Sequence, residues 1–259
     1  MNGALSPAQP LGFVKLLAHD LRWNMITALA RSDHRVQELM WLLDQPANLV
    51  SYHLKQLRDQ QLVRERRSSA DGRDIYYSLN LDTLRDRYDA VGEALHPALA
   101  ETSATSRTQD PQSLPRPVRV LFLCTENSAR SQMAEGILRH LGGDRVEAFS
   151  AGGNPSSIHP NAVSALAEIG IDISHQHSKH LEEFRDQPFD YIITVCDRVR
   201  EVCPTFPDDS ERIHWSLPDP LVEGATEAQS RAFKRTAHEL VTRIRYLLTL
   251  IDREKGKAT

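Results

Sequence analysis

The chain has 259 residues, 40% of them hydrophobic and 25% charged, with a formal net charge of −4 at pH 7. This composition is that of an ordinary globular protein with room for one large domain or two smaller ones, and the net charge gives no sign of a nucleic-acid partner. The first residues, MNGALSPAQP, lack the regions of a secretion signal, and no apolar run is long enough to span a membrane. We therefore expect a cytoplasmic protein with no membrane partner.

The first part of the chain is predicted to be mostly helical. Apolar residues recur at three- and four-residue spacing in the segments 11–30, 35–43 and 47–60, which predicts three helices. Residues 62–66 and 75–79 favour two strands joined by a glycine turn, and a last helix is expected at residues 82–95. Helix, turn, helix and a two-stranded wing together indicate an α+β winged helix-turn-helix domain, which is a DNA-reading arrangement.

A linker is expected at residues 97–117, which are rich in Ser, Thr and Pro and show no sustained apolar period. It separates a first domain at residues 1–96 from a second at residues 118–259. The second domain is predicted to alternate between two kinds of element: strands at 118–123, 146–150, 191–195 and 213–215, and helices at 131–141, 160–169 and 226–252. Such alternation indicates an α/β domain in which helices cover both faces of a four-stranded parallel sheet.

Three cysteines, Cys124, Cys196 and Cys203, are too few for a secreted disulfide framework, so we interpret them as thiols with chemistry. Cys124 ends the first strand of the second domain, where ligands of open parallel sheets bind. The loop that follows can turn its backbone N–H groups inward as an anion cradle, which would lower the pKa of the Cys124 thiol. Arg130 would offer a planar fork of donors to an oxyanion, and Ser131 a hydroxyl to the sulfur. The alternative is that Cys124 is simply a small buried residue.

The stretch CTENSARSQMAEG resembles the phosphate loop of the low-molecular-weight tyrosine phosphatase fold, whose pattern is C-x5-R-S/T. Within that fold it is most similar to the thioredoxin-coupled arsenate reductases, and the similarity continues through the SAG, GIDIS, VCDRVREVCP and HW…DP segments, from about Arg119 to Asp252. It implies an oxyanion-binding loop made of Thr125, Glu126, Asn127, Ser128, Ala129 and Arg130. Glu126 stands where the family usually has glycine, and it adds an anionic side chain near the anion site.

The resemblance also implies a relay of three thiols that disposes of two electrons. Cys124 would attack arsenate, with Asp219 as general acid for the leaving oxygen, although Asp219 has the alternative role of capping a turn. Cys196 would attack the sulfur of Cys124 and release arsenite, and Cys203 would then form a disulfide with Cys196 for thioredoxin or a small thiol to reduce. The catalytic set implied in this way is Cys124, Arg130, Ser131, Cys196, Cys203 and Asp219.

The relay carries a geometric condition. Residues seven apart in a helix are separated by roughly 10.5 Å along the axis, whereas a disulfide needs α-carbons within about 7 Å. Residues 197–202 must therefore unwind, or already form a loop, when Cys196 and Cys203 join. The six-residue spacing does not fit paired zinc ligands, and we expect neither a metal nor a cofactor.

Some members of the family hold a monovalent cation near the loop, with residues that match Asn127, Glu135 and Ser150. At the two other matching positions this chain has His177 and Lys179. We hypothesise that the ammonium group of Lys179 takes the role of the cation.

The stretch QPANLVSYHLKQLRDQQLVRERR, with the IYYSL strand after it, resembles the winged-helix ArsR/SmtB family of metalloregulators over about residues 10–95. The resemblance implies operator DNA as a partner and a homodimer. The DNA-contacting side chains would lie on the recognition helix and the wing: Asn48, Ser51, Tyr52, Lys55, Arg64, Arg66, Arg67 and Arg73. The first domain has no cysteine, so thiolate sensing of arsenite does not carry over to it. A helical interaction module with a basic edge is the alternative.

These patterns together predict a fusion of a transcriptional regulator with an arsenate reductase, involved in the arsenic response. Its partners would be operator DNA, arsenate and a thiol reductant. Two alternatives stay open for the second domain: a protein tyrosine phosphatase, or an oxyanion sensor without turnover that serves the regulator. Phosphatase activity would need Cys124, Arg130 and Asp219 but neither Cys196 nor Cys203.

Overall fold

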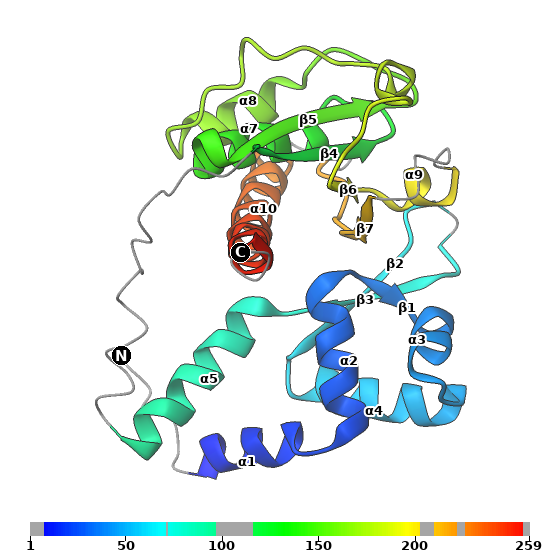
Figure 1. Cartoon of the computed structure of the whole chain (residues 1–259), viewed down its shortest axis with the longest axis vertical. Helices are drawn as coiled ribbons and strands as arrows, with labels where there is room; N and C mark the ends of the chain where they lie inside the picture. Colours follow the sequence, from blue (N-terminus) through cyan, green and yellow to red (C-terminus); the bar gives the residue numbers. More distant parts are fainter. Residues whose placement is uncertain (1–7, 71, 97–115, 203–209, 222–225, 256–259) are drawn as a thin grey trace. The chain divides into compact units, whose positions relative to one another are not determined.

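The computed structural model describes residues 8–70, 72–96, 116–202, 210–221 and 226–255. They form two compact units, the first built on the elements between residues 8 and 95 and the second on those between 118 and 255 (Figure 1). The first is a helix-turn-helix unit with a small antiparallel sheet, and the second is an α/β unit with a four-stranded parallel sheet, which confirms the predicted fold class. None of the helices in the described ranges is long and apolar enough to cross a membrane.

In its described residues, the first unit has five helices and a three-stranded sheet of order β1-β3-β2. Its helices are α1 (Ala8–Leu17), α2 (Asp20–Arg31), α3 (Val36–Leu43), α4 (Ala47–Asp59) and α5 (Leu81–Leu95). Its strands are β1 (His34–Arg35), β2 (Val63–Arg67) and β3 (Ile75–Leu79), and β2 and β3 form the antiparallel hairpin expected for a wing.

The prediction of a single helix over residues 11–30 is wrong, because the chain turns between α1 and α2. His19 has an extended backbone, and its Nδ1 accepts a hydrogen bond from the backbone N–H of Leu21 at 3.2 Å, which caps α2. Phe13 of α1 and Met25 of α2 are both buried in the same cluster. Because both helices bury apolar residues in one cluster, the apolar spacing continues across the break, and the turn cannot be recognised from that spacing.

The second unit is organised around the parallel sheet, whose strand order is β5-β4-β6-β7. The strands are β4 (Val118–Cys124), β5 (Val146–Gly152), β6 (Tyr191–Thr194) and β7 (Glu211–His214). Successive side chains of a strand point to opposite faces, and nearly all those of β4 are buried, so both faces of the sheet are covered at its centre.

The helices of the second unit are α7 (Arg130–Gly142), α8 (Pro160–Ala167), α9 (Asp197–Val202) and α10 (Thr226–Lys255), with short 3-10 turns at Gly143–Arg145 and Leu181–Phe184. Helix α7 packs on β4 and β5, and α10 packs on α7 and α8. Helix α9, which contacts β4 and β6, occupies the segment expected either to unwind or to be a loop. The structure makes it a helix, so the relay requires it to unwind.

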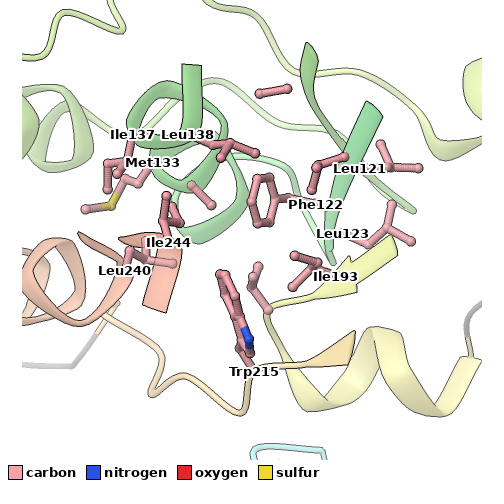
Figure 2. Packing of buried hydrophobic residues seen from close by; sticks show 14 of the residues in the cluster. Leu121, Phe122, Leu123, Met133, Ile137, Leu138, Ile193, Trp215, Leu240 and Ile244 are labelled. Atoms are coloured by element: carbon pink, nitrogen blue, oxygen red, sulfur yellow. The ribbon is translucent and has the colours of Figure 1, made fainter. Parts of the chain in front are cut away.

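The core of the second unit joins the central strand to two helices (Figure 2). Phe122 of β4 meets the ring of Trp215, with ring centroids 5.8 Å apart. Helix α10, in the segment predicted to be a helix, buries one apolar stripe: Phe233, Ala237, Leu240, Ile244, Leu247 and Ile251. This packing fixes α7, and with it the loop that enters α7, against the end of β4.

We predict that Leu240→Ala, which empties a fully buried position on α10, lowers the free energy of unfolding of this unit by about 2–5 kcal/mol. Trp23→Phe and Trp41→Phe in every variant leave Trp215 as the sole tryptophan, so its fluorescence during urea unfolding follows this core. Arg245→Ala on the exposed face of the same helix is the control, and it should change the free energy by no more than about 0.5 kcal/mol. Equal effects of the two substitutions would contradict the packing described.

Candidate functional site

The loop between β4 and α7 begins at Cys124 and ends at Arg130, as expected. Its backbone turns sharply at Asn127, whose φ of 49° lies in the left-handed region, and the N–H of Asn127 donates to the sulfur of Cys124 at 3.1 Å. Gly152 of β5 pairs with Cys124 in the sheet and lies against the loop. A Cβ at Gly152 would come within 2.7 Å of both the Asn127 nitrogen and the Thr125 carbonyl oxygen, so the loop needs glycine there. The SAG segment contains this residue, but its role requires the folded sheet.

The side-chain amide of Asn127 is fully buried and makes four hydrogen bonds. Its Nδ2 donates to Ser131 Oγ at 2.9 Å and to Ser150 Oγ at 2.8 Å. Its Oδ1 accepts from Gln132 Nε2 and from the backbone N–H of Lys179, both at 2.8 Å. The loop is therefore tied to the start of α7, to β5 and to the segment at Lys179. The contribution of Gln132 was not visible in the sequence.

The buried carboxylate of Glu135 is linked to the Asn127 amide through the hydroxyl of Ser150. Glu135 of α7 accepts from Ser150 Oγ at 2.5 Å and from the Lys179 ammonium at 3.1 Å through the same oxygen, while its other oxygen accepts from Arg139 at 2.5 Å. The ammonium also donates to the carbonyl oxygen of His177 at 3.0 Å. Lys179 thus places its charge against the Glu135 carboxylate, and its role in place of the cation stays a hypothesis.

Cys124 is buried at 4% exposure, and its sulfur lies 2.8 Å from Ser131 Oγ. Burial raises the pKa of the Cys124 thiol, and the neighbouring Cys196 raises it further; the Ser131 hydroxyl, the Arg130 charge and the Asn127 N–H oppose this rise. The expectation that the loop would lower the pKa of Cys124 is therefore wrong for this structure. Exclusion of water from the sulfur outweighs the donors that reach it.

Arg130 and Asp219 form an ion pair at the same site. The guanidinium of Arg130 donates to Asp219 Oδ2 and to the Leu217 carbonyl oxygen, both at 3.1 Å. The other carboxylate oxygen of Asp219 accepts from the backbone N–H of Leu221 at 3.1 Å. Asp219 therefore both caps a turn, which was the alternative role considered for it, and faces the arginine of the loop.

Cys196 lies two residues beyond the end of β6 and is buried. Its sulfur is 3.5 Å from the hydroxyl of Thr125, the residue that follows Cys124. Cys124 and Cys196 are both free thiols. Cys203 lies outside the described residues, so the third member of the expected relay is not placed.

One pocket gathers most of the expected site. Its lining includes Cys124, Thr125, Glu126, Ser128, Ala129, Arg130, Cys196, Arg198, Asp219 and Leu221. Ser131 lies beneath the pocket against the sulfur, and Asn127 holds the loop from inside. Arg198 was not identified from the sequence. Within the described ranges, no three His, Cys, Asp or Glu side chains are grouped in a way that could hold a metal ion.

The expected DNA-contacting residues lie on the helix and the hairpin predicted for them. The four on α4, Asn48, Ser51, Tyr52 and Lys55, are all exposed, while Val50, Leu54 and Leu57 of the same helix are buried. His53 is also buried on that helix, which the apolar pattern did not show. Of the hairpin arginines, Arg64, Arg67 and Arg73 are exposed and Arg66 is half-buried, and Arg64 donates to Asn80 Oδ1 at 2.9 Å.

Comparison with known proteins matches both units. Residues 119–257 match the family described as low molecular weight phosphotyrosine protein phosphatase, and residues 19–65 match the family described as bacterial regulatory protein, arsR family. The arsenate reductase of Halalkalibacterium halodurans is 42% identical over 127 residues, which cover 49% of this chain and 91% of that protein. For the arsenate reductase of Bacillus subtilis the identity is 39% over 127 residues, with the same coverage.

A solved thioredoxin-dependent arsenate reductase of Corynebacterium glutamicum is 25% identical and covers 89% of this chain and 98% of that one, with a TM-score of 0.44. The first of the two family matches extends over more than half of the chain and includes the whole loop from Cys124 to Arg130. The chain therefore belongs to the low molecular weight phosphotyrosine protein phosphatase family, and a segment ahead of that domain matches the family described as bacterial regulatory protein, arsR family.

Proposed function

We propose that the chain is an arsenate reductase fused to a DNA-binding transcriptional regulator of the arsenic response. The observation that carries the reductase proposal is the presence of two thiols, Cys124 and Cys196, in the pocket that also holds Arg130 and Asp219. A phosphatase needs only the first thiol. The two relatives described above, both named arsenate reductases, support the choice.

In the first step the sulfur of Cys124 attacks arsenic and one oxygen leaves as water. Arg130 holds the other oxygens through charge-assisted hydrogen bonds. Because the pKa of the Cys124 thiol is raised, its proton must be removed as the sulfur attacks. Asp219, held by Arg130 and by the Leu221 N–H, is the group that accepts this proton and passes it to the leaving oxygen.

In the second step the thiolate of Cys196 attacks the sulfur of Cys124. The electron pair of the sulfur–arsenic bond passes to arsenic, which leaves as arsenite, and a Cys124–Cys196 disulfide remains. Cys203 then attacks Cys196, which frees Cys124 and leaves a Cys196–Cys203 disulfide. Thioredoxin or a small thiol supplies the two electrons that restore the reduced enzyme. Because α9 separates Cys196 from Cys203, its turns must open in this last step.

The first unit is proposed to bind operator DNA as part of a homodimer, with α4 in the major groove and the β2–β3 hairpin on the phosphates. The exposed polar face of α4 supports this placement. The second candidate for the α/β unit is phosphotyrosine phosphatase activity, which the family match and the Cys124–Arg130–Asp219 group favour. Both candidates share the attack by Cys124, and they differ in the need for Cys196 and Cys203.

We predict that Cys203→Ser lowers steady-state arsenate reduction at least about a hundredfold, because the Cys124–Cys196 disulfide then has no thiol to resolve it. Hydrolysis of para-nitrophenyl phosphate by the same variant should stay within about twofold of the unmodified protein. Cys124→Ser is the control that should lose both reactions. Sustained arsenate turnover by Cys203→Ser would reject the relay, and arsenate reduction absent from the unmodified protein would favour the phosphatase.

A second prediction concerns pH. Because burial raises the pKa of Cys124, only a small fraction is thiolate at pH 7, and this fraction grows about tenfold for each pH unit below the pKa. The rate at which iodoacetamide alkylates Cys124, followed on its peptide by mass spectrometry without phosphate, should therefore rise steadily from pH 6 to above pH 8. Ser131→Ala removes an opposing hydrogen bond and should slow the reaction at each pH. A plateau reached below pH 7 would show a lowered pKa instead.

A third prediction concerns DNA, using an operator selected by the protein from random duplexes. Asn48→Ala, on the α4 face proposed to meet base edges, should weaken operator binding by about 1–3 kcal/mol and leave random-sequence binding nearly unchanged. Arg73→Ala, on the hairpin, should weaken both about equally and make the dependence on salt less steep. Arg245→Ala of α10 is the charge-matched control. If Asn48→Ala and Arg73→Ala behave alike, the assignment of helix and wing is incorrect.

A further inference from the structure

We infer that Arg198 is a second oxyanion-binding guanidinium of the candidate active site, and that it is specific to the reduced state. The inference rests on the proposed function in that it takes the pocket at Cys124 to be an oxyanion site. It adds a substrate-binding residue to the set formed by the loop and Arg130.

Arg198 is the second residue of α9 and lines the same pocket as Cys124, Arg130 and Asp219. Its side chain is exposed, and within the described ranges its guanidinium has no hydrogen-bond or ion-pair partner. A guanidinium presents five donors in a planar fork that matches the oxygens of a tetrahedral oxyanion. Arg198 therefore brings a free set of such donors to the pocket.

The formal charges that line the pocket favour another cation there. Two carboxylates, Glu126 and Asp219, line it, and Arg130 already donates to Asp219 and to a carbonyl oxygen. With the Cys124 thiol protonated, the lining without Arg198 would carry two negative charges against one positive charge. A dianion such as arsenate or phosphate would then enter a pocket of its own sign. With Arg198 included, the lining carries two positive and two negative charges.

The neighbouring residue explains why α9 presents Arg198 to the pocket. Asp197 is fully buried, and its Oδ1 accepts from Ser216 Oγ at 2.8 Å and lies 3.2 Å from His214 Nε2. The other ring nitrogen of His214 lies 2.8 Å from the Thr194 hydroxyl at the end of β6. The first turn of α9 is thus pinned to the ends of β6 and β7. The next residue along a helix points about 100° away, so the inward turn of Asp197 leaves Arg198 at the surface beside Cys196.

This placement ties anion binding to the redox state. The Cys196–Cys203 disulfide requires α9 to lose its turns, and Arg198 then leaves the geometry that holds it at the pocket. Arsenate carries negative charge at neutral pH, whereas arsenite is largely uncharged. Without Arg198, the pocket of the oxidised protein would therefore bind the anions arsenate and phosphate more weakly than the pocket of the reduced protein does.

The test uses inorganic phosphate, which occupies an oxyanion site without turnover. Phosphate should protect Cys124 of the reduced full-length protein from alkylation by iodoacetamide. The protection constant is the phosphate concentration that halves the alkylation rate of the Cys124 peptide, so a higher constant means weaker phosphate binding. Arg198→Ala should raise this constant about three- to tenfold, and Arg198→Lys should recover part of the loss. Arg245→Ala should leave it unchanged. The difference should shrink at about 1 M salt, where the screening length is near 3 Å, because Arg198 is exposed.

An unchanged protection constant for Arg198→Ala would overturn the inference. If that variant alters the alkylation rate without phosphate, Arg198→Met keeps the length of the side chain while removing its charge, and the same result is required of it. In assays of arsenate reduction, Arg198→Ala should have a higher KM for arsenate than the unmodified protein, while kcat should change less than about twofold. The unmodified protein with its Cys196–Cys203 disulfide formed should bind phosphate as weakly as reduced Arg198→Ala, and equal binding by the two redox states would refute the link to α9.

The outcomes separate this inference from the proposed function. Protection by phosphate needs no electron transfer. If the unmodified protein does not reduce arsenate but Arg198→Ala weakens protection by phosphate, the proposed reductase activity is rejected and the role of Arg198 is retained. If the unmodified protein and Arg198→Ala both reduce arsenate with the same KM, the proposed reductase activity is retained and the role of Arg198 is rejected.

Discussion

The buried side chain of Asn127 holds the loop from Cys124 to Arg130 in a backbone conformation that residues other than glycine seldom adopt. A left-handed residue of this kind costs of the order of 1–3 kcal/mol, and less for asparagine than for most. Four buried hydrogen bonds, each with a net contribution of about 0.5–1.5 kcal/mol, offset that cost. The direction of the Asn127 N–H toward the sulfur, and hence the shape of the proposed anion site, depends on this amide.

The chemistry of the site follows from how little water reaches it. Burial makes the Cys124 thiol a weaker acid, yet the same exclusion of water strengthens the charged hydrogen bonds that an oxyanion would receive from the buried Arg130 beside the sulfur. The Arg130–Asp219 pair gives the pocket both a clamp for oxygens and a group that can carry a proton. With Cys196 beside the loop, the proposed two-electron reduction of an oxyanion would have a nucleophile in Cys124, an anion clamp and a proton carrier in the Arg130–Asp219 pair, and a second thiol in Cys196.

Much of the fold could be predicted from apolar spacing. The continuous burial of β4 and the stripe along α10 follow from the side chains themselves, because packing against a single core imposes the period. The break between α1 and α2 could not be predicted in this way, since both helices bury side chains in one cluster and the spacing survives the turn at His19.

The site was predictable where a local pattern defines it and not where its parts meet in space. Cys124, Arg130 and Ser131 lie in one short stretch, and the structure brings them together as expected. The direction of the Cys124 pKa shift depends on how many donors reach the sulfur and how much water is excluded, which spacing does not report. Gly152 and Arg198 come from distant segments, and their roles depend on the sheet register and on the anchoring of α9.

The most direct measurement is the stoichiometry of a single anaerobic turnover. Fully reduced protein is mixed with excess arsenate and no external reductant, arsenite is counted, and the disulfides are mapped by mass spectrometry. The account predicts one arsenite for each protein chain and a single disulfide that joins Cys196 to Cys203, with Cys124 returned to the thiol. Arsenate left unreduced with all three sulfurs as thiols would contradict it.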